Sequence, residues 1–345
     1  MPHSIGTPCG AVDATSRQTC FSLTCFRLSL CAIFGAALAA GADNPPGHPK
    51  LELRGRVTGV GRLRMIRVTL YGVESAFAAS TITDPGGEFH FRDLPPGNYS
   101  LAVLRRNLGE IRRTVVISAS LADRKGAVHV IVPYSATEAA ADKSAAVVSK
   151  QQLSVPKNAW NEFMAAQKRL EKRDAEGAKR RLERAVELAP GFAAAWNSLG
   201  VMAYQSGDSA TAEHAFRQAL AAEPAMFEAA VNLGGVLLSQ GHLEEALRYN
   251  QQAVAARPRD ALANAQTGIT FFQLGDGDRA EPYLAAAERA DPAHFSRPQL
   301  FLARIYQMRG DWRAARRELQ LCIALHPDDP DVPRLRREIG ELGAR

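Results

Sequence analysis

The chain has 345 residues and a formal net charge of +6 at neutral pH, with 46% hydrophobic and 23% charged residues. This composition excludes disorder over most of the length, and the chain is long enough for two domains and a leader. Four of the five cysteines lie within the first 31 residues, which excludes a disulfide framework. The fifth, Cys322, takes an alanine position in a helix and is expected in the core.

Residues 1–42 resemble an export signal. Arg17 and Arg27 precede an apolar run at 28–40, and small residues suited to a cleavage site follow at 40–42. The run is short and rich in alanine, which favours cleavage over the alternative of a retained membrane anchor. We therefore expect an exported protein, periplasmic or envelope-associated in a bacterium and otherwise secreted.

Residues 50–133 alternate between apolar and polar side chains, as β-strands do. Seven short runs are separated by turn residues such as Pro, Gly and Asp. The predicted strands are 51–57, 65–71, 77–83, 88–91, 98–103, 111–117 and 127–132. Seven short strands with no helix between them predict a seven-stranded β-sandwich.

Two segments within these strands carry a family resemblance. Residues 83–91 read T-D-P-G-G-E-F-H-F, and residues 94–101 read L-P-P-G-N-Y-S-L. Over about 50–133 the chain is similar to the carboxypeptidase regulatory-like domain, although an extra glycine interrupts the first motif. The resemblance implies a transthyretin-like β-sandwich that serves as an accessory module for stability or binding and has no peptidase activity.

Charge is distributed unevenly along the chain. Residues 50–133 hold 13 Lys and Arg against 7 Asp and Glu, whereas residues 157–345 hold 25 of each. The arginines of the first region gather in two groups: Arg54, Arg56, Arg62, Arg64 and Arg67, and Arg105, Arg106, Arg112 and Arg113. These groups form either a solvated strand face or a contact with an acidic surface such as an anionic glycan, a lipid headgroup or an acidic protein. Nucleic acid is not expected, because no aromatic residues are interleaved with the basic ones.

Residues 134–156 have the composition of a linker. They are rich in Ala, Ser and Lys, and they show no apolar stripe broad enough to dock a helix. We therefore expect a flexible tether between two domains that move relative to each other.

Residues 157–329 repeat with a period of about 34. Prolines recur at Pro190, Pro224, Pro258, Pro292 and Pro327, and five units are recognised at 159–192, 193–226, 227–260, 261–294 and 296–329. Small residues recur inside the units, where two helices approach closely, and glycines mark the turns at Gly207, Gly241, Gly275 and Gly310. Residues 330–345 are amphipathic and are expected to form a capping helix.

The second unit shows a known pattern. Its characteristic residues are Trp196, Leu199, Gly200 and, one position late, Tyr204, followed by Ala212, Phe216, Ala219 and Pro224. These positions resemble the tetratricopeptide repeat, whose pattern is W-x2-L-G-x2-Y, then A-x3-F, then P. The resemblance implies antiparallel helix pairs that stack into an α-helical solenoid with a concave groove, which binds a protein or peptide.

No catalytic motif is present. The sequence contains no H-E-x-x-H, G-x-S-x-G, G-x-x-x-x-G-K-[ST] or C-x-x-C pattern, and the histidines of the repeats are not paired at metal-ligand spacing. We therefore expect a protein that is not an enzyme, with neither cofactor nor metal.

The family's groove-facing positions transfer to the first helix of each unit. The candidate partner-binding residues are Asn197, Val201, Tyr204, Val231, Leu238, Leu262, Ile269, Phe272, Arg297 and Arg304. Arg297 and Arg304 are candidates to hold a ligand carboxylate, because a guanidinium matches that group in geometry.

Taken together, these features predict an exported scaffold that binds a protein partner in the groove of its repeats. The alternative is a polysaccharide-binding envelope protein, in which the sandwich binds glycan and the repeats mediate assembly. A regulatory subunit of an envelope enzyme is a third reading. Exposed aromatic residues on the sandwich would favour the glycan alternative, and the candidates are Tyr71, Phe77, Phe89, Phe91 and Tyr99.

Overall fold

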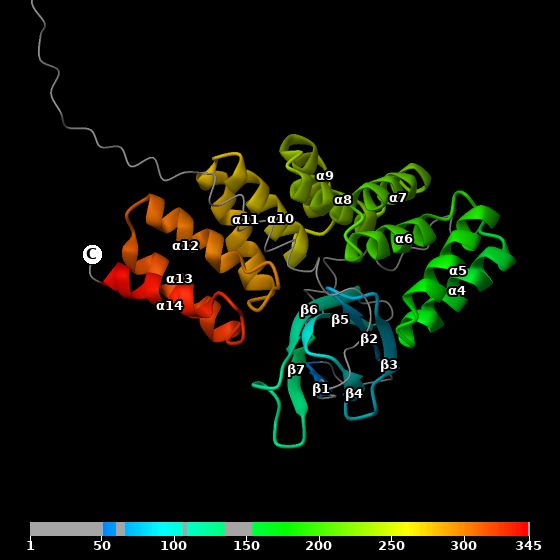
Figure 1. Cartoon of the computed structure of the whole chain (residues 1–345), viewed down its shortest axis with the longest axis horizontal. Coiled ribbons are helices and arrows are strands. Elements are labelled where there is room, and N and C mark those ends of the chain that lie inside the picture. The colour runs from blue at the N-terminus through cyan, green and yellow to red at the C-terminus, as the bar shows by residue number, and fades with distance from the viewer. Residues whose placement is uncertain (1–50, 60–65, 106–108, 135–153, 344–345) are drawn as a thin grey trace, which may run out of the picture.

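The structure is a computed structural model, and it describes residues 51–59, 66–105, 109–134 and 154–343. A β-sandwich is followed by an array of helix pairs, which confirms the predicted fold class (Figure 1). The predicted leader and most of the predicted tether lie outside the described residues. Among the described residues, no helix has both the length and the apolar character needed to cross a bilayer.

The sandwich consists of seven strands in two sheets. The strands are β1 (Leu51–Thr58), β2 (Arg67–Gly72), β3 (Ala78–Ile82), β4 (Glu88–Leu94), β5 (Gly97–Arg105), β6 (Gly109–Ile117) and β7 (Ala127–Pro133). One sheet has the order β4-β1-β7, with β1 and β7 parallel, and the other has the order β3-β2-β5-β6. β6 is thus an edge strand of the four-stranded sheet, which leaves alternate backbone N–H groups facing outward.

The sandwich core follows from the alternation in the sequence. In most strands, side chains at about every second position point between the sheets and are buried. Four of the five aromatic residues considered above belong to this core: Phe77, Phe89, Phe91 and Tyr99. Gly55 of β1 makes room for Phe89, because a Cβ atom there would lie 2.1 Å from the ring.

The helical part has eleven helices in the described residues. They are α4 (Lys157–Glu171), α5 (Ala175–Leu188), α6 (Ala193–Gln205), α7 (Ser209–Ala222), α8 (Phe227–Gln240), α9 (Leu243–Ala256), α10 (Ala261–Gln273), α11 (Gly277–Ala290), α12 (Pro298–Met308), α13 (Trp312–Leu325) and α14 (Val332–Gly343). Each pair from α4–α5 to α12–α13 forms one repeat unit, and α14 packs on α13 at the end.

Glycine has two distinct uses in the array. The predicted turn glycines adopt the left-handed conformation, with φ between 77° and 83° at Gly207, Gly241, Gly275 and Gly310. Gly200 serves close packing instead: a Cβ atom there would lie 2.5 Å from the ring of Phe216, which is fully buried. Both uses agree with the sequence-based prediction.

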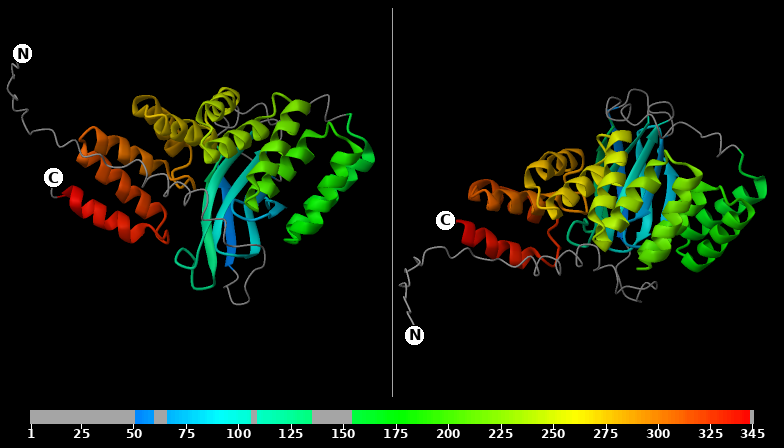
Figure 2. Two further views of the ribbon diagram at one scale, coloured as in Figure 1. Left: turned by 45° about the horizontal axis from the view of Figure 1, so that its top comes forward. Right: turned by 90° about the horizontal axis from the view of Figure 1, so that it is seen from above.

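The array curves around the sandwich. Figures 1 and 2 show the sandwich inside the arc of helices, with α4 and α5 on one side and α12 to α14 on the other. The outer face of the four-stranded sheet is turned toward the concave face of the array, on which α6, α8 and α10 lie. The two halves are therefore docked, which differs from the expectation of domains that move independently.

Candidate functional site

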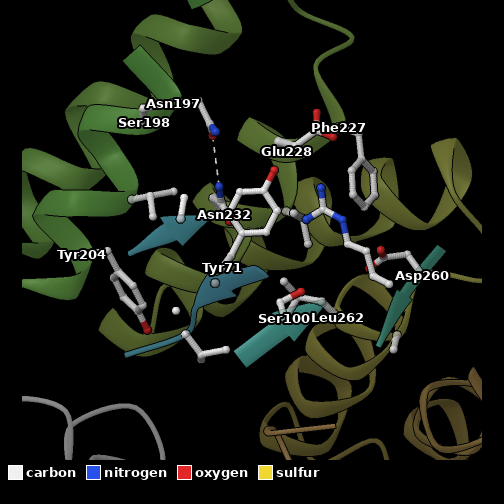
Figure 3. A pocket seen from close by; sticks show the side chains of 18 of the residues that line it. Tyr71, Ser100, Asn197, Ser198, Tyr204, Phe227, Glu228, Asn232, Asp260 and Leu262 are labelled. Atoms are coloured by element: carbon white, nitrogen blue, oxygen red, sulfur yellow. Dashed lines mark hydrogen bonds between the residues drawn. The ribbon is translucent and has the colours of Figure 1, made fainter. Parts of the chain in front are cut away.

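A cavity of about 620 Å³ lies between the sandwich and the concave face of the array. The sandwich contributes Tyr71 from β2, Ser100 from β5 and Arg112 from β6 to its lining. In Figure 3 the Tyr71 ring points toward α8, which carries Asn232 and Glu228. The cavity is the place where the groove predicted from the repeats meets the rest of the chain.

Half of the predicted groove residues line this cavity: Asn197, Val201, Tyr204, Val231 and Leu262. Asn232 of α8 donates a hydrogen bond of 3.0 Å from Nδ2 to Oδ1 of Asn197 on α6, which ties two units together across the groove (Figure 3). Burial raises the pKa of Tyr204 to about 12, so its hydroxyl stays protonated and is available for hydrogen bonding.

The remaining five predicted residues lie elsewhere. Leu238, Ile269 and Phe272 pack in the core between helix pairs, where Phe272 meets Phe301 edge to face with ring centroids 5.6 Å apart. Each of these three residues is apolar and repeats with the period of a helix. That pattern is the same for a residue packed between helices and for one that lines a groove.

The two arginines are engaged near the end of the array. Arg297 forms an ion pair with Asp329. Arg304 donates a hydrogen bond of 2.6 Å to Oε1 of Gln307, and its guanidinium lies 3.8 Å from Glu338 on the capping helix α14. Neither arginine lines the cavity between the two halves.

The sandwich contacts the first two units through its loops. The guanidinium of Arg173, at the turn after α4, lies 4.2 Å from the centroid of the Phe77 ring. Ala76 and Ala78 pack among the buried residues of the first unit, which include Leu170. In the second unit, Nε2 of Gln205 donates a hydrogen bond of 3.1 Å to the carbonyl oxygen of Gly72.

The edge strand β6 contacts the far side of the arc. The backbone N–H of Thr114 donates a hydrogen bond of 2.7 Å to Oδ2 of Asp291, the C-cap residue that follows α11. Beyond β6, the Ser120 hydroxyl donates a hydrogen bond to the carboxylate of Asp328, which follows α13 in the fifth unit. Contacts between the two halves thus extend from the first unit to the last.

Charged side chains meet at the centre of the interface. The Arg112 guanidinium bonds Glu110 on the same strand, with 2.6 Å between Nε and Oε1. On the array, Arg257 pairs with Glu228 at 2.9 Å and covers the face of the Phe227 ring, whose centroid is 3.9 Å from the guanidinium carbon. Asp260 caps α10 by accepting a hydrogen bond from the N–H of Ala263.

The pKa shifts show that these groups act on each other across the interface. Burial by itself lowers the pKa of Arg112, but the carboxylates of Glu110 and Glu228 outweigh it and raise that pKa. Burial likewise opposes ionisation of Glu228, yet Arg257 and Arg112 lower its pKa below the ordinary value. Burial raises the pKa of Asp260, and the positive charge of Arg112 on the sandwich partly offsets this rise.

Several residues of this interface were not predicted as groove residues. Asp260 and Asp291 lie at helix ends, which the groove-facing positions of the family do not include, and Tyr71 was considered only as a core or glycan-facing aromatic. A signal for Arg112 was present, because it belongs to an arginine group for which an acidic contact was considered. In the structure, acidic groups of the chain's own array face this arginine.

The lining of the cavity is suited to non-covalent binding. It offers apolar surface, side-chain amides and charges that are already paired. In the part of the chain that the structure describes, no three His, Cys, Asp or Glu side chains come together as metal ligands would.

Comparison with protein-family models matches the helical half. Models described as tetratricopeptide repeat match residues 163–213, 203–261, 237–295 and 271–339, which together span about half of the chain. Among curated proteins, the chain is 30% identical over 183 residues to cellulose synthase operon protein C of Xanthomonas axonopodis pv. citri (strain 306). That match covers 50% of this chain but only 12% of the relative, so the chain spans about an eighth of the relative's length.

Two solved structures illustrate the similarity of the helical half. The type IV pilus biogenesis factor PilW is 23% identical, with a TM-score of 0.49, over 55% of this chain and 87% of that protein. PilF of Pseudomonas aeruginosa is 21% identical, with a TM-score of 0.48, over 54% of this chain and 85% of that protein.

Proposed function

Because the chain belongs to the tetratricopeptide-repeat proteins, we propose that it is a non-enzymatic scaffold whose concave groove binds a partner protein. The observation that supports this proposal is the cavity at the centre of the concave face. Its walls combine apolar side chains such as Val231 with the amides of Asn197 and Asn232. An apolar groove with a few polar groups that fix orientation allows a peptide segment of a partner to bury its apolar side chains.

We also propose that the chain is exported and works at the cell envelope or outside the cell. The support comes from the charged and apolar pattern of residues 1–42, which resembles a cleaved signal. Mass spectrometry of the protein from its own cells should find a mature N-terminus near Asp43. An intact Met1 would contradict cleavage.

The alternative of glycan binding by the sandwich has less support from the structure. Four of the five candidate aromatic side chains lie in the sandwich core, and the fifth, Tyr71, borders the cavity beneath the array. Among these five, none forms an open aromatic platform on which a sugar ring would stack. An acidic partner for the sandwich is likewise less favoured, because Arg112 already faces carboxylates of the array.

The experiment that tests the scaffold proposal is capture of partners by the full chain and by groove variants. Tyr204→Ala and Leu262→Ala remove side chains that line the cavity, and we expect each to weaken retention of a specific protein at least about tenfold, as for a binding hot spot. Arg248→Ala is the control, because the Arg248 side chain is 75% exposed on α9, outside the cavity lining. Equal retention by all three variants, or retention of polysaccharide with no protein, would contradict the proposal.

A further inference from the structure

The concave face carries carboxylates from three places along the array. Glu228 lies in the first turn of α8, Asp260 precedes α10 and Asp291 follows α11, and all three line the cavity. The array supplies two arginines in the same region, Arg257 and Arg259. Counting these five side chains as charged, the array brings three negative and two positive charges to the cavity, an excess of one negative charge.

The sandwich brings an excess of one positive charge to the same cavity. Arg112 and Arg113 of β6 face these acids, and Glu110 is the one acidic residue that β6 adds to the lining. Two positive charges and one negative charge balance the excess on the array, so the docked interface is neutral by this count. Carboxylates that are partly removed from water are costly unless cations approach them, and here β6 adds two cations to Arg257 of the array, which pairs with Glu228.

The backbone of β6 takes part as well. Thr114 is on the edge strand of its sheet, and its outward N–H bonds Asp291 at 2.7 Å. Any extended segment presents backbone N–H groups of this kind at every second residue. The array therefore contacts β6 through two features that a free extended peptide would share, an arginine side chain and an outward N–H group.

The docked sheet leaves part of the groove unfilled. The cavity of about 620 Å³ remains between the two halves, and its apolar lining includes Val201, Met202 and Val231. A single extended segment is narrower than a four-stranded sheet and can enter this space. Such a ligand would bury apolar surface that the sandwich does not cover, which favours the ligand over the sandwich.

We propose that the concave face recognises an extended, arginine-bearing segment of a partner protein, and that β6 of the chain's own sandwich is a tethered substitute which the partner displaces. This inference rests on the proposed function, since it names the chemistry of the partner for the same groove. Covalent attachment gives the sandwich an effective concentration on the order of millimolar, so it competes with any partner. The apparent affinity for the partner then rises with the fraction of molecules in which the sandwich is undocked.

The test uses the full chain and a fluorescent peptide with the sequence of residues 109–117, G-E-I-R-R-T-V-V-I. Arg112→Glu places a negative charge against Glu228 and Asp260 and should undock the sandwich without changing the array. We expect this variant to bind the peptide at least about tenfold more tightly than the unaltered chain. Arg92→Glu is the matched control, because Arg92 lies on β4 with its side chain 69% exposed, and it should bind the peptide as the unaltered chain does.

Two further measurements keep the test independent of misfolding. Thr114→Pro removes the N–H that donates the hydrogen bond to Asp291. Because proline is tolerated on an edge strand where the N–H faces outward, the sandwich should still fold, and this variant should also bind the peptide more tightly. In the Arg112→Glu background, Asp260→Asn removes a groove charge but keeps the helix cap, since asparagine caps as well as aspartate. We expect that double variant to lose most of the gained affinity.

A second peptide tests the role of charge. Replacing both arginines of the peptide by glutamine should weaken its binding to the Arg112→Glu chain at least about tenfold. Equal affinity of the unaltered chain and Arg112→Glu, equal affinity of the two peptides, or no binding to any variant would overturn this inference. None of these outcomes would by itself remove the proposed scaffold function, which is judged by the loss of a captured partner in Tyr204→Ala and Leu262→Ala.

Discussion

The hydrogen bond between Thr114 and Asp291 makes the docking of the two halves measurable. The Thr114 N–H donates to a carboxylate oxygen at 2.7 Å, and Asp291 is 5% exposed. Asp291→Ala removes the carboxylate that accepts this hydrogen bond, so the Thr114 N–H loses that acceptor inside the interface. Because a hydrogen bond to a charged group contributes about 1.5–3 kcal/mol, we expect the docking free energy to fall by about that amount.

The burial of Asp291 places the change toward the lower end of this range. Burial raises the pKa of the carboxyl group, which means that the interface disfavours its charged form. The substitution therefore removes a desolvation cost together with the hydrogen bond. Asp291→Asn keeps an acceptor without the charge and should lose less than Asp291→Ala.

Hydrogen exchange at the Thr114 amide measures this effect directly. A loss of about 1.5–3 kcal/mol corresponds to exchange that is about 10 to 150 times faster, while amides in the centre of β5 should keep their protection because the sandwich stays folded. Asp328→Ala is the control: its carboxylate is exposed at the edge of the interface, so we expect a change below about 1 kcal/mol. Unchanged exchange of Thr114 in Asp291→Ala would mean that this hydrogen bond does not hold the two halves together.

Two other perturbations test the packing of the array and its response to pH. Gly200→Ala should destabilise the array by about 1–2 kcal/mol in chemical denaturation, because the new Cβ meets the Phe216 ring at 2.5 Å; Gly340→Ala, with open space around it, should stabilise α14 by up to about 1 kcal/mol. A change of stability in the same direction for both variants would contradict the packing described for Gly200. Burial lowers the pKa of His294 to about 3 and that of His326 to about 4, so both are neutral when folded. As the pH falls below about 6.5, these histidines take up protons in the unfolded chain before they do so in the folded one. Thermal stability should therefore drop between pH 6.5 and 4, and it should drop less steeply in His294→Asn. A melting temperature that does not change over this pH range would contradict the burial of these histidines.

The fold could be predicted from the sequence because its determinants are local. Turn glycines, the prolines that end each unit and the alternation in the strands each act within a few residues. The predicted positions of Gly200 and Gly207 agree with the structure for this reason. Gly200 leaves room for the Phe216 ring, and Gly207 adopts a left-handed conformation that favours glycine.

The groove was only partly predictable. A first-helix position such as Val201 borders the cavity, whereas the equally apolar Ile269 is in the core, and the amino-acid type does not distinguish these two environments. The docking of Arg112 against Asp260 joins residues far apart in the sequence, and no local pattern specifies it. The uneven charge of the two halves was the available signal, but it does not state which acidic surface the arginines face.

A distance between the two halves shows whether the sandwich is docked in the groove in solution. Spin labels at Arg92 on β4 and Arg248 on α9 lie on exposed surfaces outside the interface, in a chain whose native cysteines are replaced by serine, or by alanine at the buried Cys322. Pulsed electron spin resonance should give one narrow distance distribution for this chain and a broad one after Arg112→Glu. A broad distribution in the chain with Arg112 present would contradict the account, because it would mean that the sandwich and the array are joined without being docked.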